Sequence, residues 1–411
     1  MTEPAQRGAT TERVRGDGAV QHGSSLEVLR VAFRLGLTSF GGPVAHLGYF
    51  HDEYVTRRRW LDEAAYADLV ALCQFLPGPA SSELGIAVGI SRAGLLGGLM
   101  AWIGFTLPSA VALTAFALVV RGTHSVNAPW LHGLQLVTAA VVAQAVWQMW
   151  RRLAPDAQRT VMALLAAATL VLWSAPATQA VVIVVAGLIG WRLLSPGTAP
   201  PLTPTRAPVS RRLAAVMWAM LVALLVGLPV VRHFNPNGPV AVFDSFFRAG
   251  ALVFGGGHVV LPLLQASVVK PGWVSNGQFL AGYGAAQAVP GPLFTFSAYL
   301  GAIMRPQPNG VPGAAFALVA MFLPAFLLVI GTLPFWDDLR TRSSFRAALS
   351  GVNAAVVGLL LSALYRPIWT STIRTPADLG LAAAAFLLLA WLRVPPWLVV
   401  LFAAAAGIVV R

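Results

Sequence analysis

Two arginines stand inside long apolar segments, where a permanent charge is costly and usually faces a protein interior or a wet cavity. Arg34 and Arg248 each precede a glycine pair by seven residues, Gly41-Gly42 and Gly255-Gly256. Seven residues make two helical turns, so each arginine should share a face with its glycines. A guanidinium keeps its charge and matches the oxygens of an oxyanion. The pattern predicts oxyanion binding, and the alternative is that each arginine extends to the lipid headgroups.

A second motif that could bind an anion is Pro-Gly-Pro, found at Pro77-Gly78-Pro79 and again at Pro290-Gly291-Pro292. Proline removes an amide donor and clashes with the preceding turn, so each copy should break a helix. The helix that restarts after it presents free N–H groups and a positive dipole end, which together bind anions. A plain proline kink is the alternative. The side chains predicted to contact the anion near these restarts are Ser81, Ser82 and Thr295. Gln74 and Gln287, which precede the first prolines by three residues, are predicted to donate to the anion, and the alternative is that they satisfy a freed carbonyl.

Two titratable residues near these motifs are candidate proton carriers. Glu83 follows Pro79 by four residues in an apolar setting, and His258 follows the second glycine run. His46 and Asp244 are further candidates in apolar segments. The alternative for each is an ordinary buried hydrogen bond.

The arginines and prolines belong to an internal duplication. Phe33-Arg34-x-Gly36-x-x-x-Phe40-Gly41-Gly42 recurs as Phe247-Arg248-x-Gly250-x-x-x-Phe254-Gly255-Gly256. The Gln-x-x-Pro-Gly-Pro motif, one tryptophan, one Leu-Pro pair and an Ala-Ala-Val-Val run follow in the same order at offsets of 213 to 216 residues. Seven apolar segments separate equivalent positions, and an odd number predicts halves of opposite orientation. Inverted repeats of this kind place a transported substrate near mid-membrane.

The composition requires a membrane environment for these elements. Of 411 residues, 57% are hydrophobic and 10% charged, and mean hydropathy is +0.72. A soluble domain carries about 25% charged residues. A span needs about 20 residues, and backbone groups in lipid must pair within the segment. We therefore predict an all-α polytopic membrane protein with about 13 hydrophobic segments in two homologous halves, as inverted repeats with broken helices.

The chain is predicted to divide into five parts. These are a disordered polar tail (1–25), a first repeat (26–194), a proline-rich linker (195–211), a connecting transmembrane helix (212–232) and a second repeat (242–411).

Lys and Arg near the segment ends favour a cytoplasmic N-terminus. The cluster Arg57-Arg58-Arg59 does not fit this orientation, because alternating crossings would place it on the outer side of the membrane. Either the charge rule is broken there or the first glycine-rich segment does not cross completely. Whether segments 26–50 and 242–268 cross is left open.

The sequence lacks the features typical of nucleic-acid-binding proteins, cysteine metal proteins and cofactor-dependent enzymes. The net charge of +13 is attributed to juxtamembrane residues, and no soluble basic domain for nucleic acid is evident. The single cysteine, Cys73, can form neither a disulfide framework nor a cysteine metal site. No haem, flavin or iron–sulfur pattern and no P-loop is found, so we expect neither an enzyme nor a cofactor.

Two pairs of segments resemble a known family. FRLGLTSFGGPVAHLGYF with QFLPGPASSELGIAVG is similar to the first half of the chromate ion transporter family, and FFRAGALVFGGGHVVLPLL with AAQAVPGPLFTFSAYLGA to its second half. The resemblance implies the long two-domain form, a multi-pass protein of a bacterial-type inner membrane that exports chromate and confers chromate resistance. The halves differ at the glycines, since Pro43 follows the first pair while Gly257 and His258 follow the second.

The expected partners are an oxyanion substrate and the lipid bilayer, and a homodimer is allowed. An interior-negative membrane drives anions outward at about 2.3 kcal/mol per charge per 100 mV, so proton coupling is compatible with export but not required. Uptake or exchange of sulfate or another oxyanion is the alternative, because chromate and sulfate share shape and charge.

Overall fold

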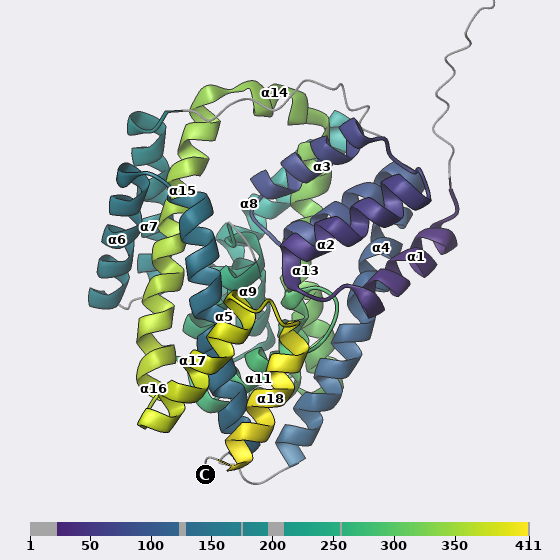
Figure 1. Cartoon of the computed structure of the whole chain (residues 1–411). Coiled ribbons are helices and arrows are strands. Elements are labelled where there is room, and N and C mark those ends of the chain that lie inside the picture. Colours follow the sequence, from purple (N-terminus) through teal and green to yellow (C-terminus); the bar gives the residue numbers. More distant parts are fainter. Residues whose placement is uncertain (1–22, 123–128, 174–175, 196–208, 255–256, 410–411) are drawn as a thin grey trace, which may run out of the picture.

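In the computed structural model, the described residues are 23–122, 129–173, 176–195, 209–254 and 257–409, and within them the secondary structure is entirely helical (Figure 1). Residues 1–22 of the predicted tail and 196–208 of the predicted linker lie outside these residues. The first half comprises α1 (Ser25–Thr38), α2 (Gly42–His51), the π-helical turn η1 (Asp52–Arg57), α3 (Glu63–Phe75), α4 (Ala80–Gly122), α5 (Pro129–Leu153), α6 (Ala157–Leu172) and α7 (Pro176–Leu193). The connecting helix is α8 (Arg211–Phe234).

The second half repeats this order. It comprises α9 (Pro239–Ala251), η2 (Gly257–Val259), α10 (Val260–Leu264), η3 (Gln265–Val269), α11 (Asn276–Ala286), η4 (Leu293–Thr295), α12 (Phe296–Ile303), α13 (Gly310–Thr332), η5 (Leu333–Phe335), α14 (Trp336–Thr341), α15 (Ser343–Ala363), η6 (Leu364–Trp369), α16 (Thr370–Thr372), α17 (Pro376–Ala390) and α18 (Pro396–Val409).

Five helical stretches among the described residues are long and apolar enough to cross a membrane. They are Ala80–Arg121, Pro129–Leu153, Arg211–Phe234, Gly310–Thr341 and Ser343–Thr372. Most of the other apolar helices are half-length, with 10 to 17 residues. The all-helical polytopic prediction is confirmed.

The first half opens with two helical hairpins that return to the side from which they enter. Glu27, in the first turn of α1, pairs with Arg58 at 3.3 Å and with Arg92 at 3.4 Å. The Arg92 guanidinium also lies over the Trp60 ring, and its carbonyl accepts from the Gly23 N–H. These contacts bring together the start of α1, the end of η1 and the end of the first part of α4. We call this end of the two hairpins, around Glu27, Arg58 and Arg92, the first mouth. There α4 bends at a non-helical pair, Ala93 and Gly94.

The second half repeats this arrangement at its own mouth. The Trp273 indole donates to Asn237 at 2.9 Å, just before α9, and the Arg305 N–H donates to the Trp273 carbonyl at 3.0 Å, just after α12. The two mouths lie on opposite sides. Residues 95–122 of α4 form one helix of roughly 42 Å, which starts at the first mouth and ends where Arg121 donates to Asn309 at the second. The predicted inversion of the halves is confirmed.

The re-entrant hairpins explain how the arginine cluster agrees with the charge rule. Because the first glycine-rich segment turns back, Arg57-Arg58-Arg59 lies on the same side as the start of α1. Segments 26–50 and 242–268, left open by the sequence, fold back rather than cross. Among the seven segments counted between equivalent positions, 26–50 and 63–91 are the two hairpins of the first half and turn back. The remaining five segments are again an odd number.

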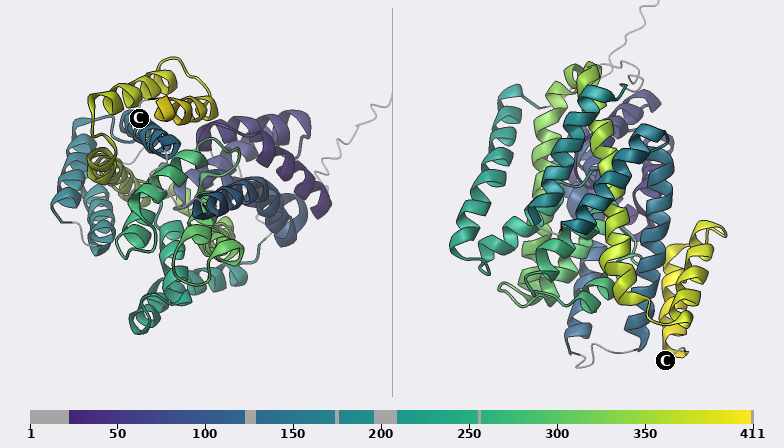
Figure 2. Two further views of the ribbon diagram at one scale, coloured as in Figure 1. Left: turned by 90° about the horizontal axis from the view of Figure 1, so that it is seen from below. Right: turned by 90° about the vertical axis from the view of Figure 1, so that its left-hand side faces the viewer.

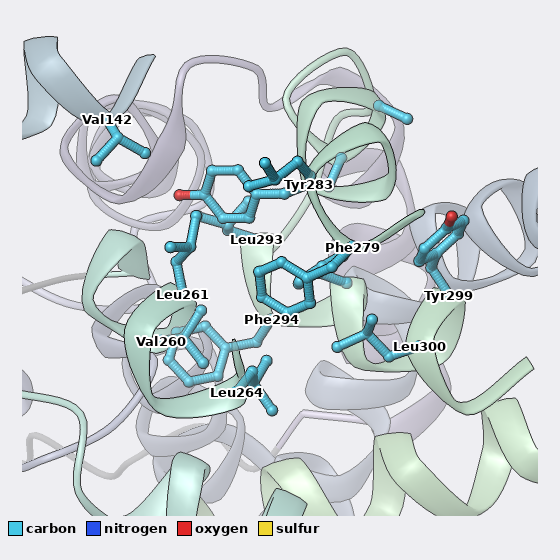
Figure 3. Close-up of a cluster of buried hydrophobic side chains, with 14 of the residues drawn as sticks. Val142, Val260, Leu261, Leu264, Phe279, Tyr283, Leu293, Phe294, Tyr299 and Leu300 are labelled. Carbon is cyan, nitrogen blue, oxygen red and sulfur yellow. The ribbon is translucent and has the colours of Figure 1, made fainter. Parts of the chain in front are cut away.

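The halves interlock through small residues that allow close backbone approach. Gly284 of α11 packs against the Leu134 carbonyl of α5, and the Thr138 hydroxyl of α5 donates to the Leu280 carbonyl at 2.9 Å. Figure 3 shows Val142 of α5 beside the aromatic and aliphatic core built by α10, α11, η4 and α12. One helix of the first half thus completes the core of the second.

The connecting helix α8 stands at the edge of the bundle (Figure 2). It packs on α9 and α13, where the Trp218 indole donates to the Gly331 carbonyl at 3.0 Å. Most of its surface is exposed and apolar, which suits contact with lipid. No described helix precedes α1 to cover the equivalent face of the first half.

Candidate functional site at the helix breaks

Each half contains two interrupted helices, and glycine occupies the strained position of each described break. The chain between α1 and α2 passes through Gly41 and Gly42, with φ of 96° and 77°. Gly78 has φ of 151° between α3 and α4, and Gly291 has φ of 97° between α11 and η4. Residues with a Cβ rarely adopt these conformations. The predicted Pro-Gly-Pro breaks are present, whereas Gly255 and Gly256 lie outside the described residues.

The breaks of the two halves are bonded to one another reciprocally. The Gly78 N–H donates to the Val253 carbonyl at 2.7 Å, and the Gly291 N–H donates to the Ser39 carbonyl at 2.9 Å. Gly78 and Gly291 are equivalent in the repeat, as are Ser39 and Val253. Each Pro-Gly-Pro break therefore pairs with the glycine break of the other half. Four interrupted helices meet at this point, which we name the crossing.

Buried hydroxyls without partners gather around the crossing. Ser39 and Ser82 are 0% and 2% exposed, and their hydroxyls have no hydrogen-bond partner among the described residues. Thr106, in the middle of α4, and Ser297, in the first turn of α12, are in the same state. Buried polar groups are nearly always paired, so unpaired ones indicate sites for water or a ligand.

Glu83 is the buried acid of the crossing. It is fully buried, neither carboxylate oxygen has a partner among the described residues, and the carboxylate lies against Gly78. The equivalent residue of the second half is Phe296. The two halves therefore present unequal surfaces to whatever occupies the crossing.

Two half-helices begin at the crossing, as predicted. Ser81 lies in the first turn of α4 and is buried. Thr295 is also buried, but its hydroxyl donates to the Pro292 carbonyl at 2.7 Å and is therefore already engaged.

The two glutamines have different surroundings. The Tyr283 hydroxyl is 2.8 Å from His258 Nδ1. Gln287 is one turn further along toward the second Pro-Gly-Pro, and its amide nitrogen has no hydrogen-bond partner among the described residues. Gln74 instead accepts from Arg152 at 3.2 Å. His46, the other histidine candidate, is buried against Phe50 and Phe105.

The structure does not bring the two arginines to the crossing. Arg34 lies on the exposed face of α1, between exposed Phe33 and Leu37. Arg248 donates to Asp244 at 2.7 Å and to the Leu225 carbonyl of α8 at 3.0 Å. Asp244 is thereby engaged in an ion pair, and the oxyanion role of the arginines stays a prediction.

Sequence reasoning missed the contribution of α4. Ser109 lies 2.9 Å from the position that a Cβ on Gly291 would take, and Thr106 is one turn earlier. Both flank Pro108, whose Leu-Pro pair is part of the duplication. That duplicated pair was the available signal.

Two cavities with basic linings lie on opposite sides of the crossing. One, of about 460 Å³, includes Lys270, Asn276 and Arg366 at the second mouth, with no acidic side chain among its described lining. The other, of about 230 Å³, is lined by Gln74, Phe75 and side chains of α14 and α15.

An all-helical protein of two inverted halves, with broken helices meeting in the middle, has the architecture of a secondary membrane transporter. The chain matches the model of the chromate transporter family over residues 26–191 and 240–408 and belongs to that family.

Curated relatives match this chain over most of their own length. A chromate transport protein of Pseudomonas aeruginosa is 31% identical over 80% of this chain and 77% of its own. A probable chromate transport protein of Synechococcus elongatus is 28% identical over 92% and 93%, and a chromate transport protein of Cupriavidus metallidurans is 26% identical over 92% and 90%. No solved structure matches the chain.

Proposed function

We propose that the chain exports chromate, a tetrahedral dianion, across a bacterial plasma membrane and that chromate binds at the crossing. The observation that carries the proposal is the reciprocal pair of hydrogen bonds, because it brings two half-helix starts and four interrupted backbones to one buried point. The names of the relatives support chromate as the substrate.

Binding at the crossing would rely on dipoles rather than on a cationic side chain. The starts of α4 and η4 offer free N–H groups and positive dipole ends. The hydroxyls of Ser39, Ser82 and Thr106 add donors that are otherwise unpaired. A site of many weak donors can both dehydrate the anion and release it, as a carrier requires.

Glu83 would carry a proton while the anion is bound. An ionised carboxylate and a dianion about 5 Å apart repel each other by roughly 7 kcal/mol at an effective dielectric constant of about 20. A protonated Glu83 removes this repulsion and adds a hydrogen-bond donor. The hydrogen-bonded pair His258 and Tyr283 offers a second proton-bearing site on the other side of the crossing.

The orientation follows from the basic side chains at the two mouths. Arg57-Arg58-Arg59 and Arg92 lie at the first mouth with the start of α1, and Arg152 reaches the same side through Gln74. Positive residues favour the cytoplasmic side, so we place the first mouth and the N-terminus inside. Export then moves the dianion down the membrane potential, with roughly 4.6 kcal/mol available per 100 mV.

The test is chromate flux in everted membrane vesicles with an imposed potential. Wild-type vesicles should accumulate chromate faster when the lumen is positive, and Ser82→Ala should lower the rate several-fold at equal expression. Thr169→Ala is a matched control, because that α6 hydroxyl has an ordinary partner in the Leu165 carbonyl. Flux that ignores the potential, or sulfate flux without chromate flux, would overturn the proposal and favour a sulfate carrier.

A further inference from the structure

A buried ion pair ties the two halves together on the first-mouth side of the crossing. Asp68 of α3 accepts from Arg340 of α14 and, at 3.0 Å, from the Trp336 indole. The Asp68 and Arg340 side chains are each 2% exposed. Asp337, one turn before Arg340, pairs with the same guanidinium. This contact of the first half's α3 with the second half's α14 is named here the latch.

Aromatic rings extend the latch to the end of α3. The Phe75 ring, in the last helical residue before the first Pro-Gly-Pro, lies 5.4 Å from Trp336 and 4.4 Å from Phe345, centroid to centroid. The equivalents of Asp68 and Phe75 in the second half are Ala281 and Ala288, so that half cannot form this contact. The latch is therefore specific to the first mouth.

Behind the latch lies the cavity of about 230 Å³ that is lined by Ala71, Gln74, Phe75, Trp336, Arg340 and Arg346. This is room for several water molecules. Arg152 enters the same region through its bond to Gln74, and Arg346 donates to the Arg340 carbonyl at 2.7 Å. Two guanidiniums thus line a cavity that borders the residues leading into the break, and a third, from Arg152, is bonded to the Gln74 side chain in its wall.

The charges around the cavity sum to +1, and to +2 once Asp68 has been displaced from Arg340, which a dianion balances. Arg152, Arg340 and Arg346 give three positive charges, and the carboxylates of Asp68 and Asp337 give two negative ones. Guanidinium forks fit the paired oxygens of a carboxylate and of a tetrahedral oxyanion equally well. A dianion can therefore replace Asp68 at Arg340, which a singly charged halide does less well.

We propose that this cavity is a tetrahedral-oxyanion subsite at the first mouth, and that the anion opens the path to the crossing by competing with Asp68 for Arg340. Once the latch is broken, the first turns of α3 keep their packing on α4 and their contacts with α2, from Tyr66 to the Leu47 carbonyl and from Glu63 to His51, while the last turn can move away from α14. Its last turn carries Gln74 and Phe75 out of the way of the first Pro-Gly-Pro. The idea rests on the proposed function for its physiological ligand, but the subsite itself can be tested without transport.

The chain supplies its own reporter for movement of α3. Cys73 is the single cysteine of the sequence, lies next to Gln74, and is 1% exposed on the face of α3 turned toward the core. The experiment measures maleimide labelling of Cys73 in the purified full-length protein, with sodium sulfate titrated against sodium chloride at constant ionic strength. Sulfate should accelerate labelling several-fold, whereas chloride should not.

Variants separate the subsite from the latch. Asp68→Asn keeps the acceptor for the Trp336 indole but weakens the hold on Arg340, so labelling should be fast without sulfate. Arg346→Gln should keep labelling slow and remove the response to sulfate. Asp378→Asn is the matched control, because Asp378 also makes a buried contact between the halves, to His132 at 2.7 Å, and it should label like wild type. Tryptophan fluorescence and thermal unfolding check that each variant is folded.

The proposal is overturned if sulfate leaves wild-type labelling unchanged, or if folded Arg346→Gln responds to sulfate as wild type does. Its failure is distinguishable from failure of the proposed function. A chain that moves no chromate in vesicles can still show the sulfate-dependent exposure of Cys73, and a chromate exporter can still lack it.

Discussion

Gly291→Ala tests whether the crossing depends on contact between the halves. Gly291 has φ of 97°, and a Cβ there would lie 2.9 Å from the Ser109 hydroxyl and 3.2 Å from the Phe105 carbonyl. The left-handed backbone costs a residue with a Cβ about 1–2 kcal/mol. Crowding in a packed interior costs about 1–3 kcal/mol. The variant should therefore lose roughly 2–5 kcal/mol, or relax by breaking the bond from its N–H to Ser39.

The assay has two readouts on the same preparation. The apparent thermal-unfolding midpoint of detergent-purified protein should fall, and chromate flux in vesicles should be lost even where folded protein remains. Gly227→Ala is the matched control, since a Cβ at this α8 position meets nothing within 4 Å. Alanine in a helix is favoured over glycine by about 1 kcal/mol, so the control should be neutral or slightly stabilising.

A second substitution sharpens the test. Removing the hydroxyl in Gly291→Ala/Ser109→Ala relieves the closest of the two contacts, so part of the stability should return. Unchanged midpoint and flux in Gly291→Ala would refute the reasoning, because the break would then tolerate a side chain. A double variant no better than the single one would refute the assignment of crowding to Ser109.

Three further predictions concern charged side chains. Glu83→Gln keeps the shape of the side chain but cannot carry a proton, so the dependence of vesicle flux on pH should be weaker than in wild type; an equal dependence in the variant would contradict the proton role. Asp244→Asn deprives Arg248 of its carboxylate and should lower the unfolding midpoint by the equivalent of about 1–3 kcal/mol, while flux per folded molecule is kept. At the first mouth, the hydrogen bond to Glu63 at 2.9 Å raises the pKa of His51. Its stabilisation is complete below the unfolded pKa near 6.5 and is lost as pH rises through the folded value, and Glu63→Gln should flatten that slope in thermal unfolding from about pH 5 to 8.

The duplication let the sequence predict the architecture, because helix breaks and inversion follow from motif order and segment count. It could not distinguish a crossing segment from a re-entrant one. Segments 26–50 and 242–268 are long enough to span, and hydropathy does not register a turn at mid-depth. Charge placement was the usable signal, since Arg57-Arg58-Arg59 fits the charge rule once the segment turns back.

The arginines show that the spacing of a motif does not fix the direction in which its side chains point. Arg34 was aligned with Gly41-Gly42 across seven residues, but the helix ends at Thr38 and the chain reorients there. Gly36 faces α4, where a Cβ would lie 2.7 Å from the Phe105 carbonyl. A helix rotates about 100° per residue, so Arg34, two residues earlier, is directed away from that face. The reciprocal bonds at the crossing depend on contacts between the halves, which no local pattern contains.

The reciprocal pairing also has a consequence for biosynthesis. Gly291, which supplies the donor for the Ser39 carbonyl, is encoded 252 residues later. At elongation rates of roughly 5–20 residues per second, the nascent first half waits about 13–50 s inside the bilayer with this acceptor unmatched, and an unsatisfied group there costs several kcal/mol. The glycine break of the first half therefore stays unpaired until the segment around Gly291 has been made, so the two halves complete the crossing together.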